Sequence, residues 1–262
     1  MKVELLSYTP DAMNLLLRTK NTRLKFESDP ASWSEEQKCE QLSYMRDTIK
    51  SSYEFVDYTF SIEGVSRAFT HELVRTRTGS YAQESQRTID ASGNGYLNPF
   101  DTTEPVHHQR EADRGHAFDD ASALAFATYR ALLADGAAAQ DARGILPTAT
   151  LTNIIAKFNL RTLHETAKVR LCTRTAGEYQ RVFREMRARV IEVHPWVEEH
   201  AFIEVHCASE GTCAFPRYGR KECKFYDPRM DLDALKLETR AKFWSAKELQ
   251  VAVPIAINGK TM

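Results

Sequence analysis

The sequence predicts an α+β fold, in which a mixed sheet carries flanking helices within a single domain of residues 1–262. Some segments place apolar residues at every second position, which is typical of strands with one buried face. Other segments place them at 3.6 spacing, which is typical of amphipathic helices. The two kinds of segment alternate along the chain. With 262 residues, 42% of them hydrophobic, the chain can bury one substantial core.

The N-terminal part predicts one strand and two helices. A short strand is expected over residues 3–8, followed by a helix over 12–18 that Asp11 is placed to cap. A second helix is expected over 34–49, because a serine and two glutamates open it. Cys39 lies on its apolar face and is expected in the core.

A second strand and a helix follow directly on one another. Residues 53–62 predict a strand whose buried face carries alternate apolar residues, namely Val56, Tyr58, Phe60 and Ile62. The next segment has apolar residues at helical spacing, namely Val65, Phe69 and Leu73. This helix is expected to end at Arg77 and to hold the polar segment that follows.

The segment 75–87 concentrates the chemistry of the chain. It contains three arginines, several hydroxyl groups and two glutamines. Arginine presents a planar fork of donors that suits phosphate or a heterocycle with paired acceptors, so the pattern favours a nucleotide. A structural alternative stands beside this hypothesis, because arginines near a helix end also neutralise its last carbonyls, and polar stretches are commonly solvated loops.

The middle of the chain predicts a turn-rich connection over 90–99 and a helix over 105–137. The expected apolar face of this helix is Phe118, Leu124, Phe126, Tyr129, Leu132 and Leu133. His107, His108 and His116 lack the i, i+4 spacing of metal ligands on one helix face, so no metal is expected there.

The last third predicts a strand over 150–158, a helix that contains Leu163 and ends at His194-Pro195, a helix over 231–244 and an apolar run over 251–257. Three of the five cysteines, Cys207, Cys213 and Cys223, lie here without a Cys-x-x-Cys pair. Buried thiols are therefore expected rather than zinc ligands.

Charge and hydropathy exclude several classes of protein. The formal net charge is −1, which argues against nucleic-acid binding over a broad basic face. No apolar stretch reaches the length of a membrane span, and residues 1–4 open no signal-peptide hydrophobic region. An odd number of cysteines fits a reducing compartment. The expected location is the cytoplasm, with no membrane partner.

The polar segment resembles the signature of the flavin-dependent thymidylate synthases, which is Arg-His-Arg, seven further residues and Ser. Arg75, Arg77 and Ser85 hold this spacing, and Arg87 falls where that family also has arginine. Thr76 departs from the signature, because the family has histidine there.

The resemblance continues through the second half of the chain. The family has an arginine before Leu-Pro, then a strand, then Asn-x-Arg, then an arginine eleven residues after that asparagine. In this sequence these residues are Arg143, Asn159, Arg161 and Arg170. Further departures from the family pattern are Phe55 for a flavin-contacting histidine, Thr88 for tyrosine, and Thr175-Ala176-Gly177-Glu178 where the family usually has an Ala-Gln pair and a tryptophan.

The resemblance implies a flavin-dependent nucleotide C5-methyltransferase that binds FAD and uses methylenetetrahydrofolate and NADPH as co-substrates. Its substrate would be UMP or dUMP, and the departures suggest a specialised member of the kind found in nucleoside-antibiotic pathways. A flavin would replace the thiol that other thymidylate synthases use in a Pro-Cys-His setting. This chain has no Pro-Cys pair, and Cys172 is expected in the core or behind the residues that contact the ligands rather than as a nucleophile.

The resemblance also implies roles for named residues. Arg170 and Ser85 would be catalytic. The FAD-binding set would be Arg75, Thr76, Arg77, Gln83, Asn159 and Arg161. The set that binds the nucleotide would be Glu72, Arg75, Glu84, Ser85, Arg87, Arg143 and Arg170. No metal is implied, and the active sites would be shared between the subunits of a homotetramer.

Three alternatives stay open on the sequence. One is a pyrimidine nucleotide 5-hydroxymethylase, which needs the same sites with a different final step. Another is an inactive nucleotide-binding module, and the third is an RNA-binding protein whose affinity falls steeply with salt.

Overall fold

The computed structural model describes residues 1–22, 29–48, 50–100, 109–175, 177–201, 203–227 and 229. The chain divides into two compact units, Met1–Glu204 and Val205–Met262, so the single domain stays a prediction. The helix expected over 231–244, the apolar run over 251–257, His107 and His108 lie outside the described residues.

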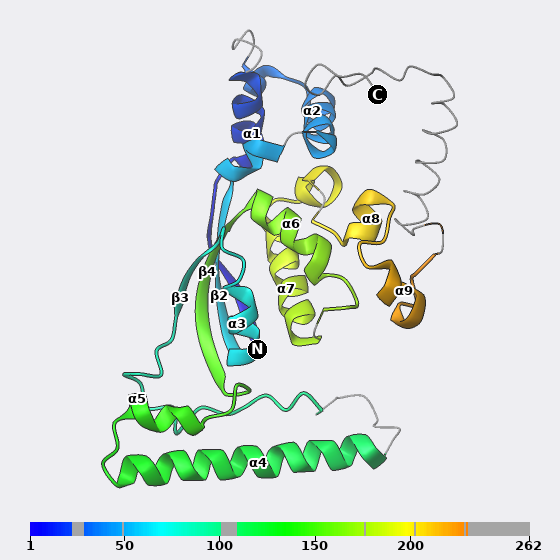
Figure 1. The fold of residues 1–262 in the computed structure, drawn as a ribbon. Coiled ribbons are helices and arrows are strands. Elements are labelled where there is room, and N and C mark those ends of the chain that lie inside the picture. Colours follow the sequence, from blue (N-terminus) through cyan, green and yellow to red (C-terminus); the bar gives the residue numbers. More distant parts are fainter. Residues whose placement is uncertain are drawn as a thin grey trace, which may run out of the picture. The chain divides into compact units, whose positions relative to one another are not determined.

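A four-stranded sheet forms the centre of the first unit (Figure 1). Its strands are β1 (Lys2–Tyr8), β2 (Asp57–Ser66), β3 (Ser80–Gln83) and β4 (Leu151–Asn159), in the order β1-β2-β4-β3. The predicted α+β class is confirmed. Every described strand pairing in this sheet is antiparallel.

The alternating apolar residues decide which face of the sheet is buried. Tyr58, Phe60 and Ile62 point into the core with no exposed surface, whereas Ile155 on the opposite face is 44% exposed. The β2–β4 register shifts between Ile62 and Val65, where Gly64 takes a φ of 64° that favours glycine. Beyond this bulge β2 continues to Ser66, which caps the next helix.

Three helices position the candidate site beside this sheet. They are α3 (Arg67–Leu73), α6 (Leu160–Arg170) and α7 (Gly177–Val193). Figure 1 shows α6 and α7 covering the same face of the sheet. The buried face of α7 consists of Tyr179, Val182, Phe183, Met186 and Val190. Burying each large apolar side chain of this kind contributes about 1.5–3 kcal/mol to stability.

The helix expected to contain Leu163 and to end at His194-Pro195 is interrupted, although its end agrees with that of α7 at Val193. The observed α6 ends at Arg170, and a turn separates it from α7. The helix expected to end at Arg77 also stops earlier, at Leu73. Each observed helix end has an arginine at it or just beyond it: Arg170 is the last residue of α6, and Arg75 follows the end of α3.

The N-terminal helices match the predicted order but correct several details. They are α1 (Ala12–Asn21), η2 (Pro30–Ser32), α2 (Glu35–Asp47) and η3 (Lys50–Phe55). Ser34 caps α2 through a capping box, as expected. Asp11 makes no cap hydrogen bond, because its carboxylate instead accepts from the Asn14 amide. Cys39 is partly exposed rather than in the core. The strand expected from residue 53 starts at Asp57, because 3-10 turns precede it.

The long helix α4 (Gln109–Ala134) packs on α5 (Ala139–Ala142) and η4 (Arg143–Ile145) (Figure 1). Tyr129 has no exposed surface and forms a small core with Ala91 and Ala142. The expected burial of Leu124 is wrong, because this side chain is 69% exposed.

After η5 (Val197–Ala201), the second unit contains α8 (His206–Glu210) and α9 (Pro216–Glu222). Its three cysteines are free thiols of intermediate exposure, which corrects the expected burial. In the part of the chain that the structure describes, no group of histidine, cysteine and acidic residues is arranged to hold a metal. None of the helices described there is long and apolar enough to cross a bilayer.

Candidate active site

The arginine-rich segment begins in a loop that two neighbours hold in place. The Tyr81 hydroxyl donates to the carbonyl of Leu73 at 3.0 Å or to that of Thr76 at 2.6 Å. Gly79 passes so close that a Cβ there would lie 2.5 Å from the Tyr81 hydroxyl and 2.6 Å from the Phe158 ring. A larger residue at position 79 would displace this loop. Close packing against Tyr81 and Phe158 therefore fixes the backbone that carries Arg75 and Arg77.

A cavity of about 590 Å³ opens beside this loop. Three of the predicted FAD-binding residues line it together: Thr76, Asn159 and Arg161. Asn159 caps the N-terminus of α6, because its side-chain oxygen accepts from the Thr162 amide at 2.8 Å. This cap therefore places Arg161 in the first turn of α6, at the cavity wall.

The residues that line the cavity are all polar or charged, with two glutamates against one arginine. Arg161 forms an ion pair with Glu54, and Glu165 lies 3.5 Å from Lys168. The remaining lining residues are the threonines Thr78, Thr162 and Thr166. Hydroxyl and amide groups suit a heterocycle with several acceptors and donors, and the volume lies in the usual range for cofactor sites. The residues present therefore fit the ring system of a flavin.

A second arrangement joins the ends of α3 and α6. The Arg170 Nη1 atom donates to Glu72 Oε2 at 3.1 Å. The same guanidinium lies over the Tyr179 ring, 4.2 Å from its centroid. Arg170 is one turn beyond Thr166, which lines the cavity. The predicted catalytic arginine thus lies close to the predicted cofactor site.

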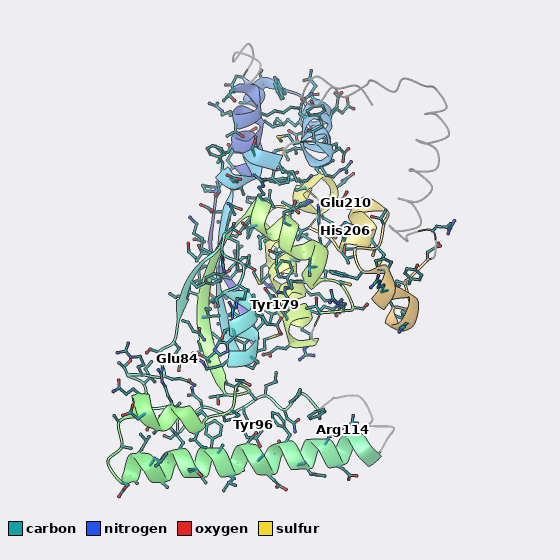
Figure 2. All side chains as sticks on the ribbon, in the orientation of Figure 1. Glu84, Tyr96, Arg114, Tyr179, His206 and Glu210 are labelled. Atoms are coloured by element: carbon teal, nitrogen blue, oxygen red, sulfur yellow. The ribbon has the colours of Figure 1, made fainter. Side chains whose placement is uncertain are left out.

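A third arrangement gathers cations near the start of α3. Burial lowers the pKa of the Arg67 guanidinium, the charge of Arg143 lowers it further, and Glu84 opposes both effects. Glu84 is held at the end of β3 by the Asn153 amide, which donates to it at 2.8 Å, and it lies toward α5 in Figure 2. Two nearby arginines with one shared carboxylate leave excess positive charge, which suits a phosphate.

The other predicted site residues lie between these arrangements. Ser85 and Arg87 are exposed just after β3, and the Ser85 hydroxyl accepts from the Arg87 amide at 3.2 Å. The side chains of Arg75 and Arg77 are exposed and outside the cavity lining. Gln83 also lies outside the lining, where its amide donates to Thr70 at 2.8 Å.

Several residues of these arrangements were missed by sequence reasoning. Arg67 follows the serine that caps α3, and this cap indicates only that Arg67 begins a helix. Tyr179 has the helical spacing of a core residue, and this spacing does not predict a contact with Arg170. Glu54, Thr162, Glu165 and Thr166 join the cavity only through packing of η3 against α6, which no local pattern indicates.

The antiparallel sheet with helices on one face carries a cavity lined by polar residues and two groups of arginines around the ends of α3 and α6. A family model described as thymidylate synthase complementing protein matches residues 4–196. The chain belongs to this family, which confirms the predicted resemblance.

Curated relatives and a solved structure agree. Similarity to a flavin-dependent thymidylate synthase of Nitratidesulfovibrio vulgaris is 32% identity over 245 residues, covering 88% of this chain and 97% of the relative. A flavin-dependent thymidylate synthase of Geobacter sulfurreducens is 38% identical over 148 residues, and the match spans 56% of this chain and 62% of that relative. A crystal structure described as a UMP/dUMP methylase PolB from Streptomyces cacaoi, bound with 5-Br dUMP, shares the fold with a TM-score of 0.67 and 20% identity, over 78% of this chain and 97% of that chain.

Proposed function

We propose that this chain catalyses FAD-dependent C5 methylation of a uridine monophosphate, dUMP or UMP, with methylenetetrahydrofolate as carbon donor and NADPH as reductant. The observation that carries the proposal is the position of Arg170, which the ion pair with Glu72 holds at the end of α6, one turn from a polar cavity that fits a flavin. A uracil ring next to this guanidinium would lie beside the cofactor.

Arg170 supplies charge rather than a proton. A guanidinium stays protonated at neutral pH, so it stabilises negative charge that develops on the carbonyl edge of a uracil ring. Glu72 restricts the rotation of the guanidinium by accepting one of its N–H groups. The fixed orientation lowers the cost of reorganisation when charge develops.

We assign the phosphate and sugar of the nucleotide to the group of arginines near the start of α3. Arg143 and Arg67 bring two guanidiniums together, and Arg87 follows Ser85 on the same polar segment. The Ser85 hydroxyl accepts from the Arg87 amide and can still donate its own proton to a phosphate or sugar oxygen. Glu84 fits a sugar hydroxyl because a carboxylate only accepts.

FAD, when bound, would supply the reducing electrons for methyl transfer. Thr76, Asn159 and Arg161 line the cavity that would hold its ring. Arg75 and Arg77 lie on the adjacent loop and would contact its phosphates, and Gln83 would complete this set from β3. The exposure of these two arginines agrees with a site that closes against another subunit, so a homotetramer with shared sites belongs to the proposal.

The test is a side-by-side assay of UMP and dUMP with methylenetetrahydrofolate, NADPH and FAD, followed by product mass. Gain of one CH2 group on either nucleotide supports the proposal, and the ratio of the two rates gives the ribose preference. A gain of CH2O identifies a hydroxymethylase instead. Nucleotide binding without any product identifies an inactive binding module.

A further inference from the structure

Tyr179 lies at the start of α7 and touches the arginine to which the proposed function assigns the developing charge. Its side chain is 1% exposed, and the Arg170 guanidinium covers its ring at 4.2 Å from the centroid. Burial raises the pKa of Tyr179, and the charge of Arg170 opposes this rise. The phenol is therefore neutral at physiological pH and meets the cation with its ring face.

The ring of Tyr179 is itself fixed. It packs edge-on against Phe69 of α3, with ring centroids 5.0 Å apart. The preceding residue, Glu178, accepts from the amide of Ser66 at 2.7 Å and from its hydroxyl at 2.5 Å. These contacts tie the first turn of α7 to the first turn of α3 (Figure 2 labels Tyr179 between these helices).

Glu72 and Tyr179 restrain Arg170 in different ways. Glu72 binds one terminal nitrogen and limits rotation of the guanidinium in its plane. An ion pair alone leaves the plane of a guanidinium free to tilt, whereas an aromatic ring packed against its face fixes the tilt. The Tyr179 hydroxyl is buried without a partner at hydrogen-bonding geometry, although Thr76 and Arg170 lie near it and lower its pKa, so the ring face is the contact that Tyr179→Phe would keep.

We infer that Tyr179 is a positioning residue that sets the plane of the Arg170 guanidinium for the nucleotide ring. This inference rests on the proposed function for its kinetic consequence, but not for its structural one. It predicts that the aromatic face is needed and the hydroxyl is not.

The experiment compares Tyr179→Phe and Tyr179→Leu with the wild type. Phe183→Leu is the matched control, because Phe183 is a ring of similar burial one turn further along α7. We expect Tyr179→Phe to retain kcat within about twofold and Tyr179→Leu to lose about tenfold, which corresponds to a cation–π contact of about 1.4 kcal/mol. Phe183→Leu should lower the melting temperature as Tyr179→Leu does and leave kcat nearly unchanged.

Crystal structures of the same proteins provide a readout that does not need turnover. The guanidinium plane should match the wild type in Tyr179→Phe and tilt or disorder in Tyr179→Leu. An unmoved guanidinium in Tyr179→Leu, or equal kcat losses in Tyr179→Leu and Phe183→Leu, would overturn the inference. A wild type without methyl product would instead overturn the proposed function, while the crystal structures would still decide the role of Tyr179.

Discussion

The Nη1 atom of Arg170 lies 3.1 Å from the Oε2 atom of Glu72, and this ion pair joins the last turn of α6 to the last turn of α3. The Arg170 side chain is 26% exposed and that of Glu72 is 48% exposed, so the pair contributes little to stability by itself. Its consequence is geometric. It places a cation between the end of α3 and the end of α6, the helix whose N-terminal half lines the cavity.

Removing that cation should stop the reaction without emptying the flavin site. Arg170→Ala is expected to reduce methylation by at least ~100-fold, because a fixed charge near a developing anion is worth about 2.7–4 kcal/mol. Flavin absorbance after incubation with FAD and gel filtration should be unchanged. Arg189→Ala, which breaks ion pairs on the exposed side of α7, is the control. Near-normal turnover of Arg170→Ala would remove this residue from the mechanism.

Ser85 should act on the nucleotide and not on the flavin. Ser85→Ala is expected to weaken nucleotide binding by about 1.5–3 kcal/mol, the contribution of a hydrogen bond to a charged group. Isothermal titration with dUMP and UMP measures the change. Ser7→Ala, on the exposed part of β1, controls for loss of a surface hydroxyl. If dUMP and UMP bind both variants equally well, Ser85 has no contact with the nucleotide.

Arg161 should act on the flavin and not on the nucleotide. Arg161→Ala removes a cavity wall and is expected to weaken FAD binding about tenfold or more, since the loss of a charged donor costs about 1.5–3 kcal/mol. Fluorescence quenching of added FAD gives the affinity. Glu54→Gln breaks the ion pair with Arg161 but keeps the guanidinium, so it should cost far less. Equal losses in the two variants would show that the ion pair, rather than a flavin contact, explains the effect.

The strands, most of the helices and the residue types of the candidate site could be predicted from the sequence. Period two identified β2 and β4, and a capping box identified the start of α2. The sequence was not sufficient for the loop after α3. There the helix stops early because Tyr81 binds the carbonyls of Leu73 and Thr76, a contact made across the turn that local propensity does not contain.

Burial was the other point at which pattern and structure diverged. Leu124 has the spacing of a core residue but lies on the outer side of α4, and no sequence pattern indicates that the buried Tyr179 ring contacts Arg170. Periodicity assigns a face to a helix, but it does not say what covers that face. The grouping of Arg67, Arg143 and Glu84 likewise depends on how distant elements pack.

His164 should make the protein sensitive to mild acid. It is 2% exposed, its Nδ1 atom lies 2.9 Å from the Ala201 carbonyl, and burial lowers its pKa. In the unfolded chain His164 binds a proton below its usual pKa, near 6.5. In the folded protein burial disfavours the protonated ring, so His164 stays neutral to lower pH. Stability should therefore be full above pH ~6.5 and fall below it, by up to about 1.4 kcal/mol per pH unit.

Chemical unfolding between pH 7.5 and 5.5 tests this effect, because carboxylates titrate mainly at lower pH (~4). His164→Asn keeps a donor for the Ala201 carbonyl and removes the titrating ring, so it should flatten the slope. His194, whose pKa burial also lowers, should account for the part that remains. An unchanged slope in His164→Asn would assign the acid sensitivity to other groups.

In the proposed reaction a bound flavin, and no thiol of this chain, supplies the reducing chemistry to a uridylate held by arginines. Cys172 is the thiol two residues beyond Arg170 and is partly exposed. The most direct measurement is the mass of the nucleotide product formed by Cys172→Ala with and without FAD. We predict methylated nucleotide at the wild-type rate with FAD and none without it. Methylation that persists without FAD, or that disappears with Cys172, would contradict this proposal.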